Sequence, residues 1–283
     1  MSGSVQFWKM HGLGNDYIVI DNRDEKICDK TASALAKKLC TRRFSIGADG
    51  LLLVCNSKVA DVKMRIFNSD GSEAEMCGNG IRCFSKYCYE TGISKKSEFQ
   101  VETLSGVKNI WLSLNVNDDV VSVKVDMGIP NWNCRSLSMN GMDTCINYNL
   151  AVDKENCNVT CLSMGNPHCV MFVENVDKTP VERVGPLVEN HPIFSNRANV
   201  GFVQVISENE IKVRVWERGC GETLACGTGI CAAVAVANKL GKVGNNVFVH
   251  VLGGDLQVEI GKNSLFLSGA AEKVYHGMMF GEI

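Results

Sequence analysis

The 283-residue sequence lacks a long hydrophobic run, a strong net charge and a cluster of basic residues. Its longest wholly apolar stretch, residues 230–237, is too short to span a bilayer. Lys and Arg number 29 and Asp and Glu number 31, and this near-balance argues against a protein that binds nucleic acid through its phosphates. The first residues have neither the basic nor the apolar segment of an export signal. We therefore expect a cytoplasmic protein that contacts neither membrane nor nucleic acid.

Zinc and thioredoxin motifs are also missing, although cysteine is abundant at 14 residues. No C-x-x-C occurs, and the one C-x3-C, at 157–161, has no second pair at zinc-finger spacing. We therefore expect no bound metal. Without an export signal, most of the thiols should be free and buried in a reducing compartment. Functional thiols would then act as acids, bases or nucleophiles.

The chain repeats itself with a period of about 150 residues. Residues 62–81 align without a gap with residues 211–230, and the match includes Cys77 with Cys226. Upstream, 14–20 matches 165–171, and downstream, 101–106 matches 249–254. Such a period is too long for a solenoid. It predicts two similar domains with a pseudo-twofold relation.

Hydrophobic periodicity places each cysteine between a strand and a helix. Alternation predicts strands at 62–67 and 211–216, and further strands are expected at 51–55, 120–125, 199–206 and 247–252. After each Cys-Gly-x-Gly, apolar residues at helical spacing predict a helix that ends near Gly92 or Gly241. Another helix is predicted at 31–40, and turn-rich residues 117–119 mark a candidate domain junction. The predicted fold is α+β, with each domain a mostly antiparallel sheet wrapped around a central buried helix.

Each of the matched cysteines, Cys77 and Cys226, precedes a glycine-rich turn that opens a helix. A helix N-terminus lowers the pKa of a thiol and offers free N–H groups to a carboxylate. Two such thiols on opposite faces of one amino-acid Cα could invert it, one removing the proton and the other returning a proton. The alternative is that both are merely small buried residues of duplicated domains.

Polar side chains around the cysteines depart from the repeat. Asn68 aligns with Glu217, and the next position aligns Ser69 with Arg218. This difference would let a site distinguish the two ends of a substrate; the alternative is that Glu217 and Arg218 form a solvated surface pair. Asn15 and Asn166 could bind polar groups or simply serve their turns. His168 could tune a thiolate or could be a structural histidine.

Four segments, 9–17, 67–82, 163–168 and 217–229, resemble the motifs of diaminopimelate epimerase in the same order. The resemblance implies a cofactor-independent isomerase that interconverts LL- and meso-2,6-diaminopimelate through the two cysteines, in lysine and cell-wall precursor synthesis. It also implies a homodimer with Tyr275 near its interface. The family's final strand returns to the first domain, which gives a first domain of 1–118 with 273–283 and a second of 119–272.

The resemblance further assigns site residues by position. His168 and Glu217 would tune the thiols. Some members carry a Gln at the position of Gly50 that touches substrate, so Gly50 could replace it only through backbone or water. Substrate would be bound by Asn15, Asn68, Asn166, Asn199, Glu217 and Arg218, and its reacting carboxylate by the backbone at Gly78, Asn79, Gly227 and Thr228.

Two other interpretations remain open from the residues alone. A proline racemase or a PhzF-like enzyme shares the two-domain plan, although the four motifs argue against both. A non-enzymatic thiol protein, such as a redox sensor or a zinc-binding module, belongs to a different class. Retention of stoichiometric metal by the purified protein would favour the zinc module.

Overall fold

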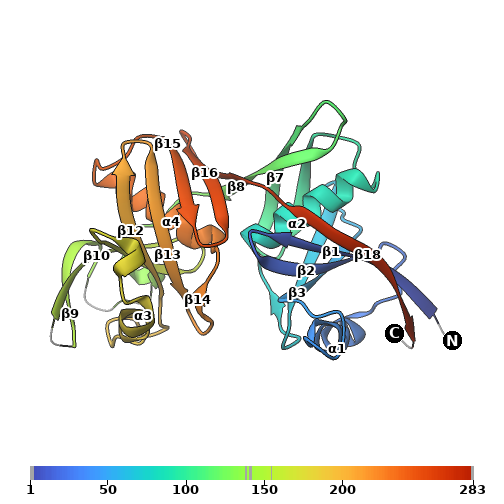
Figure 1. Cartoon of the computed structure of the whole chain (residues 1–283), viewed down its shortest axis with the longest axis horizontal. Coiled ribbons are helices and arrows are strands. Elements are labelled where there is room, and N and C mark those ends of the chain that lie inside the picture. The colour runs from blue at the N-terminus through green and yellow to red at the C-terminus, as the bar shows by residue number, and fades with distance from the viewer. Residues whose placement is uncertain (1–2, 138, 140–141, 154, 282–283) are drawn as a thin grey trace. The chain divides into compact units, whose positions relative to one another are not determined.

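A computed structural model describes residues 3–137, 139, 142–153 and 155–281 of the chain. The chain divides into two units, residues 1–126 with 268–283 (unit 1) and residues 127–267 (unit 2). Strands dominate both units, and each contains two α-helices among its described residues, which confirms the α+β class. Figure 1 labels the elements in chain order.

Unit 1 is built on strands that surround one of its two helices. β1 pairs antiparallel with both β2 and β18, β2 runs parallel to β3, and β3 pairs antiparallel with β4. β4 pairs antiparallel with β5 and parallel with β6, and the meander β6–β7–β8 completes the unit. Its strands are β1 (Gly3–Gly12), β2 (Asn15–Asp21), β3 (Gly50–Cys55), β4 (Val62–Asn68), β5 (Glu73–Ala74), β6 (Glu98–Thr103), β7 (Gly106–Leu114), β8 (Val120–Gly128) and β18 (Glu272–Gly281). Its helices are α1 (Asp29–Cys40) and α2 (Gly78–Glu90).

Unit 2 repeats the same pairing pattern with different residues. β10 pairs antiparallel with β9 and β11, β11 runs parallel to β12, and β12 pairs antiparallel with β13. β13 pairs antiparallel with β14 and parallel with β15, which pairs antiparallel with β16. Its strands are β9 (Cys145–Val152), β10 (Glu155–Ser163), β11 (Pro167–Phe172), β12 (Asn199–Ser207), β13 (Glu210–Glu217), β14 (Gly221–Thr223), β15 (Asn246–Val251), β16 (Gly254–Ile260) and β17 (Leu265–Gly269). Its helices are α3 (Val181–Glu189) and α4 (Gly227–Lys239), and two short 3₁₀ turns span Cys134–Leu137 and Val176–Lys178.

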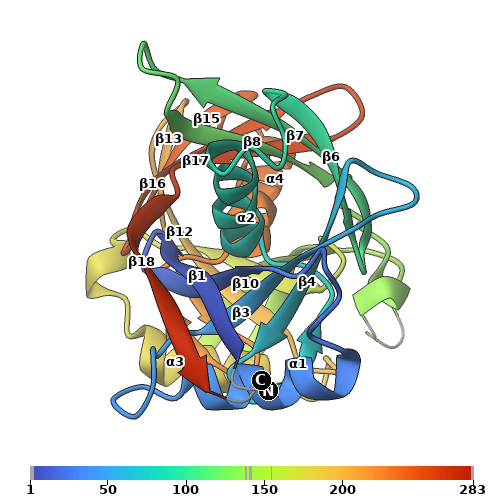
Figure 2. The ribbon, with the colours of Figure 1, turned by 90° about the vertical axis from the view of Figure 1, so that its right-hand side faces the viewer.

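The second helix of each unit is the central one. α2 contacts β1, β2, β3 and β4, and Figure 2 shows it next to β1. α4 contacts β10, β11, β12, β13 and β16. From Ile230 to Ala237 every α4 residue is buried, because the sequence there is apolar on all faces. These contacts confirm the predicted helix wrapped by strands. α1 lies outside this core and packs one apolar face against β3 and β4.

The unit boundaries differ from those expected at 118/119 and 272/273. Residues 117–119 form the turn of the β7–β8 hairpin, where Asn115 Oδ1 accepts from the backbone N–H of Asp119 at 3.0 Å. The first boundary therefore falls later, after Asp126. The return to unit 1 begins earlier, at Ser268, because the Gly269 and Ala270 carbonyls accept from Ser122 and Arg82. Residues 1–2 and 282–283 of the expected first domain lie outside the described residues.

Candidate active site

Cys77 caps the N-terminus of α2. Its backbone is extended, and its Sγ accepts a hydrogen bond from the Gly80 N–H at 3.5 Å. Gly80 lies close to the apolar groups of β2, β3 and β4, where an added Cβ would meet the Ile66 side chain at 3.3 Å. The positive end of the α2 dipole lies at this position. The sequence prediction of a thiol at a helix start is therefore confirmed for this residue.

Two polar side chains from the start of β2 reach Cys77. The Tyr17 hydroxyl oxygen lies 2.9 Å from Sγ and donates to Oδ1 of Asn15 at 2.6 Å. Asn79 Nδ2 also donates to that Oδ1, at 3.3 Å, and Asn15 Nδ2 donates to Asp49 at 2.8 Å. The structure thus places Asn15, Asn79 and Cys77 together. Sequence reasoning missed Tyr17, although its alignment with His168 in the repeat was a signal that could have found it.

Gly50 begins β3 and Asn68 ends β4, and both lie near Tyr17. The register pairs Gly50 with Tyr17 across β2 and β3 and with Asn68 across β3 and β4. A Cβ on Gly50 would come within 2.8 Å of the Phe67 carbonyl oxygen and 3.0 Å of Tyr17 Cε1. Asn68 Nδ2 donates to Ser72 at 2.9 Å. This half-site therefore has no room for a larger residue at position 50.

Arg82 supports the first turn of α2 from inside unit 1. Its guanidinium donates to the Gly78 carbonyl at 3.0 Å, to Asn79 Oδ1 at 2.9 Å and to the Ala270 carbonyl at 3.1 Å. The side chain is fully buried. It therefore fixes the turn that carries Cys77 and brings a positive charge near it. No pattern in the sequence indicated this role for Arg82.

Cys226 occupies the equivalent position at the start of α4. Its Sγ lies 3.6 Å from the Thr228 hydroxyl oxygen. Burial, together with the charge and hydrogen bonding of Glu217, raises the pKa of the Cys226 thiol well above its usual value. Glu217 Oε1 in turn accepts from the Thr223 hydroxyl at 2.6 Å. The cap of α4 thus combines a protonated thiol with a carboxylate.

The other expected residues of unit 2 form a connected network. His168 Nε2 bonds Asn166 Oδ1 at 2.9 Å, and Asn166 Nδ2 donates to Thr228 at 3.3 Å. Burial lowers the pKa of His168 to about 3, so its imidazole is neutral near pH 7. The connection from His168 to Cys226 therefore runs through Asn166 and Thr228. The expected tuning of a thiol by His168 stays a prediction.

Asn199 and Arg218 lie at the neighbouring strand ends. Asn199 Nδ2 donates to the Pro167 carbonyl at 2.8 Å, and its Oδ1 accepts from the Arg218 N–H at 3.0 Å. Its amide therefore joins β11 to the turn after β13. The Arg218 guanidinium donates to the Asn196 carbonyl at 3.1 Å. These contacts position Arg218, while its expected contact with substrate stays a prediction.

The two half-sites have the same construction and different side chains. β2 and β3 pair Tyr17 with Gly50, and β11 and β12 pair His168 with Asn199 in the same parallel manner. Each of the residues Tyr17 and His168 bonds the asparagine two positions before it. The repeat therefore provides two similar frames, each with a cysteine at a helix N-terminus.

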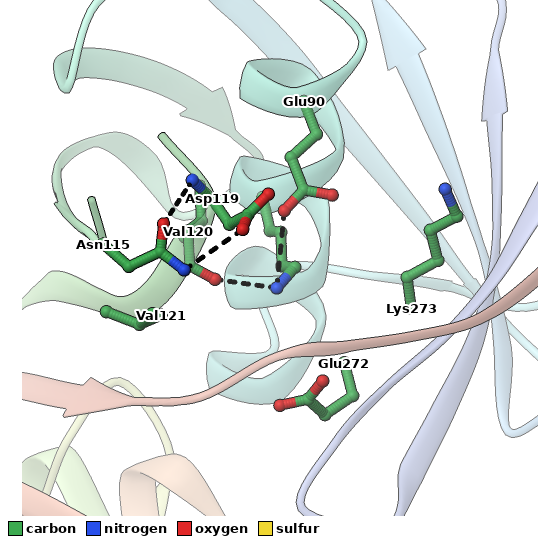
Figure 3. A pocket seen from close by; sticks show the side chains of 8 residues that line it. Glu90, Asn115, Asp119, Val120, Val121, Glu272 and Lys273 are labelled. Carbon is green, nitrogen blue, oxygen red and sulfur yellow. Dashed lines mark hydrogen bonds and ion pairs between the residues drawn. The ribbon is translucent and has the colours of Figure 1, made fainter. Parts of the chain in front are cut away.

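A separate pocket in unit 1 lies away from this half-site. Its polar lining includes Lys86, which donates to the Val120 carbonyl at 2.7 Å and pairs with Glu90 at 3.4 Å (Figure 3). The remaining lining residues are Asn115, Asp119, Val121, Glu272 and Lys273. It contains none of the expected site residues.

The described part of the chain contains no cluster of three or more His, Cys, Asp or Glu residues that could hold a metal ion. None of its helices is long and apolar enough to cross a membrane. All 14 cysteines, each of which lies in the described ranges, are free thiols.

Comparison with known proteins decides the family. The profile of the family described as diaminopimelate epimerase matches residues 7–133 and 160–274. A diaminopimelate epimerase of Moorella thermoacetica is 48% identical over 276 residues, covering 96% of this chain and 98% of that protein. The chain belongs to the diaminopimelate epimerase family. A diaminopimelate epimerase of Methanococcus maripaludis is 46% identical, with 96% of this chain and 99% of that protein covered. Membership makes the protein an isomerase.

Solved structures extend the likeness of this diaminopimelate epimerase family member at the level of the fold. A PhzF-family phenazine biosynthesis protein of Bacillus anthracis superposes with a TM-score of 0.72 at 18% identity, over 98% of this chain and 99% of that one. A hydroxyproline epimerase of Agrobacterium vitis gives 0.71 at 14% identity, over 98% and 92%. These TM-scores show a shared fold, and at such low identities the likeness is limited to the fold.

Proposed function

We propose that the protein interconverts LL-2,6-diaminopimelate and meso-2,6-diaminopimelate without a cofactor, using Cys77 and Cys226 as its two acid–base groups. The observation that carries the proposal is the equivalent placement of these two thiols, each at the N-cap of the central helix of its unit. The name of the relatives at 45–48% identity supports diaminopimelate as the substrate.

The proposed reaction is an inversion at one Cα. A thiolate accepts the Cα proton, the electron pair of the broken C–H bond moves toward the carboxylate, and a thiol on the opposite face supplies a proton to Cα. Backbone N–H groups at Gly78, Asn79, Gly227 and Thr228 would stabilise the negative charge that develops on the carboxylate. Glu217 would keep Cys226 protonated until it donates, and neutral His168 would orient Asn166 toward the substrate.

Specificity would come from the polar side chains that differ between the half-sites. Arg218 is suited to the carboxylate of the non-reacting end of the substrate, because its guanidinium can pair with both carboxylate oxygens. Asparagine amides can accept from an ammonium group and donate to a carboxylate. We assign substrate binding to Asn15, Gly50, Asn68, Asn166, Asn199, Glu217 and Arg218, with Gly50 contributing its backbone.

The setting of the enzyme is part of the proposal. We expect a cytoplasmic homodimer that acts in lysine and cell-wall precursor synthesis. Apolar side chains exposed along β18, including Tyr275 at 43% and Phe280 at 80%, support an interface on that strand. Free thiols throughout the chain fit a reducing compartment.

Exchange of the Cα proton tests the proposal. Purified protein is incubated with LL-2,6-diaminopimelate in D2O, and chiral chromatography with mass spectrometry follows the meso product and its deuterium. We expect one deuterium per inverted centre, and loss of turnover in both Cys77→Ala and Cys226→Ala. Proline and lysine serve as alternative substrates. Faster turnover of either one would overturn the substrate assignment, and full activity of either cysteine variant would overturn the mechanism.

A further inference from the structure

The hydroxyl of Tyr17 is shared between Cys77 and Asn15. Its oxygen lies 2.9 Å from Sγ of Cys77 and 2.6 Å from Oδ1 of Asn15. A phenol has one proton, so it can donate to only one of these two acceptors at a time. The tyrosine is 4% exposed, and its ring packs against the backbone of Gly50. The hydroxyl can therefore turn between the two acceptors while the ring stays in place.

Tyr17 keeps its proton over the range in which thiols ionise. Burial, with a smaller contribution from the neighbouring Cys77, raises the pKa of Tyr17 well above its usual value. A neutral hydroxyl that donates to a thiolate makes a charge-assisted bond, which is stronger than the bond it makes to a neutral acceptor. The contact at 2.9 Å therefore places the Tyr17 hydroxyl where it can donate to the Cys77 sulfur.

The other half-site provides a contrast. The groups beside Cys226 are the Thr228 hydroxyl and Glu217, whose carboxylate disfavours a thiolate. His168, the equivalent of Tyr17, bonds Asn166. A neutral hydroxyl that can donate thus lies beside Cys77, whereas a carboxylate lies beside Cys226.

We propose that Tyr17 is a positioning residue whose hydroxyl donates to Cys77 when this residue is a thiolate and turns to Asn15 when the thiol is protonated. In the first state Cys77 is ready to accept the Cα proton. When the Cα–H bond breaks, the proton forms the S–H bond, the electron pair stays on the substrate, and Tyr17 keeps its own proton. The inference rests on the proposed function because it uses Cys77 as the base.

The test compares Tyr17→Phe with a matched control, Tyr89→Phe. Tyr89 lies in the same unit, and its hydroxyl donates to Asp118 at 2.8 Å. Each protein is alkylated with limiting iodoacetamide from pH 5 to pH 10, and mass spectrometry quantifies the Cys77 peptide, with the exposed Cys28 as an internal reference. Turnover of both diaminopimelate stereoisomers is measured in parallel, and circular dichroism checks the fold.

We expect Tyr17→Phe to shift the midpoint of Cys77 alkylation to higher pH and to lower kcat by about 10- to 100-fold, the range for one hydrogen bond to a charged group. KM should change less, and the Tyr89→Phe protein should match the wild type in every measurement. An unchanged alkylation profile with unchanged kcat would overturn the proposal. A rise in KM alone would also overturn it, since Tyr17 would then act only through Asn15.

Two further observations keep the test decisive. If the wild type does not epimerise diaminopimelate, the proposed function fails, yet the alkylation profile still measures the Tyr17–Cys77 interaction. If Tyr17→Phe does not fold, wild-type protein labelled with 3-fluorotyrosine replaces it, because the more acidic phenol is a stronger donor. The Cys77 midpoint should then move to lower pH relative to Cys28, and an unmoved midpoint would overturn the proposal.

Discussion

Tyr17 and Gly50 face each other across β2 and β3, and the tyrosine ring occupies the space that a side chain at position 50 would need. The two residues are thus sterically linked. A larger residue at position 50 would require the ring, and with it the hydroxyl beside Cys77, to move. The Tyr17 ring can therefore keep its observed position only because residue 50 has no side chain.

Gly50→Ala should impair the Cys77 half-site. Its Cβ would meet Phe67 O at 2.8 Å and Tyr17 Cε1 at 3.0 Å, so the ring must shift. We expect a loss of stability of about 1–3 kcal/mol, as for other overpacked positions, and a fall in kcat. The control is Gly201→Ala in β12, where the new Cβ would lie 3.7 Å from Val170. Chemical unfolding and steady-state kinetics check both, and equal effects of the two substitutions would contradict the steric link.

Glu217→Gln should make Cys226 easier to ionise. The carboxylate contributes to the raised pKa of this thiol, so its neutral amide should let the pKa fall. Alkylation of the Cys226 peptide should then begin at lower pH, while turnover falls because the thiol no longer keeps its proton. Glu182→Gln, on the exposed face of α3, is the control. A Cys226 profile that does not respond to Glu217→Gln would argue against contact between the two groups.

His168 should make stability depend on acidity. Burial lowers its pKa to about 3, against 6.5 for an unperturbed histidine, so between these values the unfolded chain binds the proton and the folded protein does not. The contribution of neutral His168 to the free energy of unfolding is therefore fully present above pH 6.5. It is lost as the pH decreases toward 3, by about a few kcal/mol. Urea unfolding of wild type and His168→Gln from pH 4 to pH 8 measures the difference. Parallel pH dependences would show that another group is responsible.

Arg82→Met should destabilise unit 1 strongly. The substitution removes the hydrogen bonds of the guanidinium to Gly78, Asn79 and Ala270. We expect a loss of about 3 kcal/mol or more, because each hydrogen bond from a charged group contributes about 1.5–3 kcal/mol. Arg23→Met, which breaks an exposed pair with Asp21, should cost less than about 1 kcal/mol. Similar losses in the two variants would mean that the carbonyls find other donors.

Local pattern predicted much of the fold. The helices after Cys77 and Cys226 and the strands before them follow from spacing that involves only neighbouring residues. The turn at 117–119 was different, because a hairpin and a domain junction have the same turn-rich composition. Only the pairing of β7 with β8 distinguishes them. The position of the first boundary therefore required the structure.

In the candidate site, too, local sequence patterns predict some residues, whereas others depend on contacts between distant parts of the chain. Cysteines at helix starts and asparagines in matched turns can be predicted from the sequence, whereas Tyr17, in the continuous apolar run of β2, looks like an ordinary core residue. Its contact with Cys77 joins positions 60 residues apart. Arg82 likewise bonds Ala270, which is 188 residues away. Contacts over such separations depend on how the strands are ordered, and spacing does not encode that order.

The return of β18 to unit 1 sets an order for folding during synthesis. Unit 2 is one continuous stretch of chain, so all its strand partners are present once residue 267 has been made. β1 is made first, but its antiparallel partner β18 starts only at Glu272. One edge of β1 therefore stays unpaired until nearly the whole chain has been made, whereas β2 can pair with the other edge as soon as it is synthesised. The nascent chain thus exposes an unpaired β1 edge throughout the synthesis of unit 2. Because an unpaired edge can pair with another chain, this edge is where a nascent-chain chaperone would be most useful.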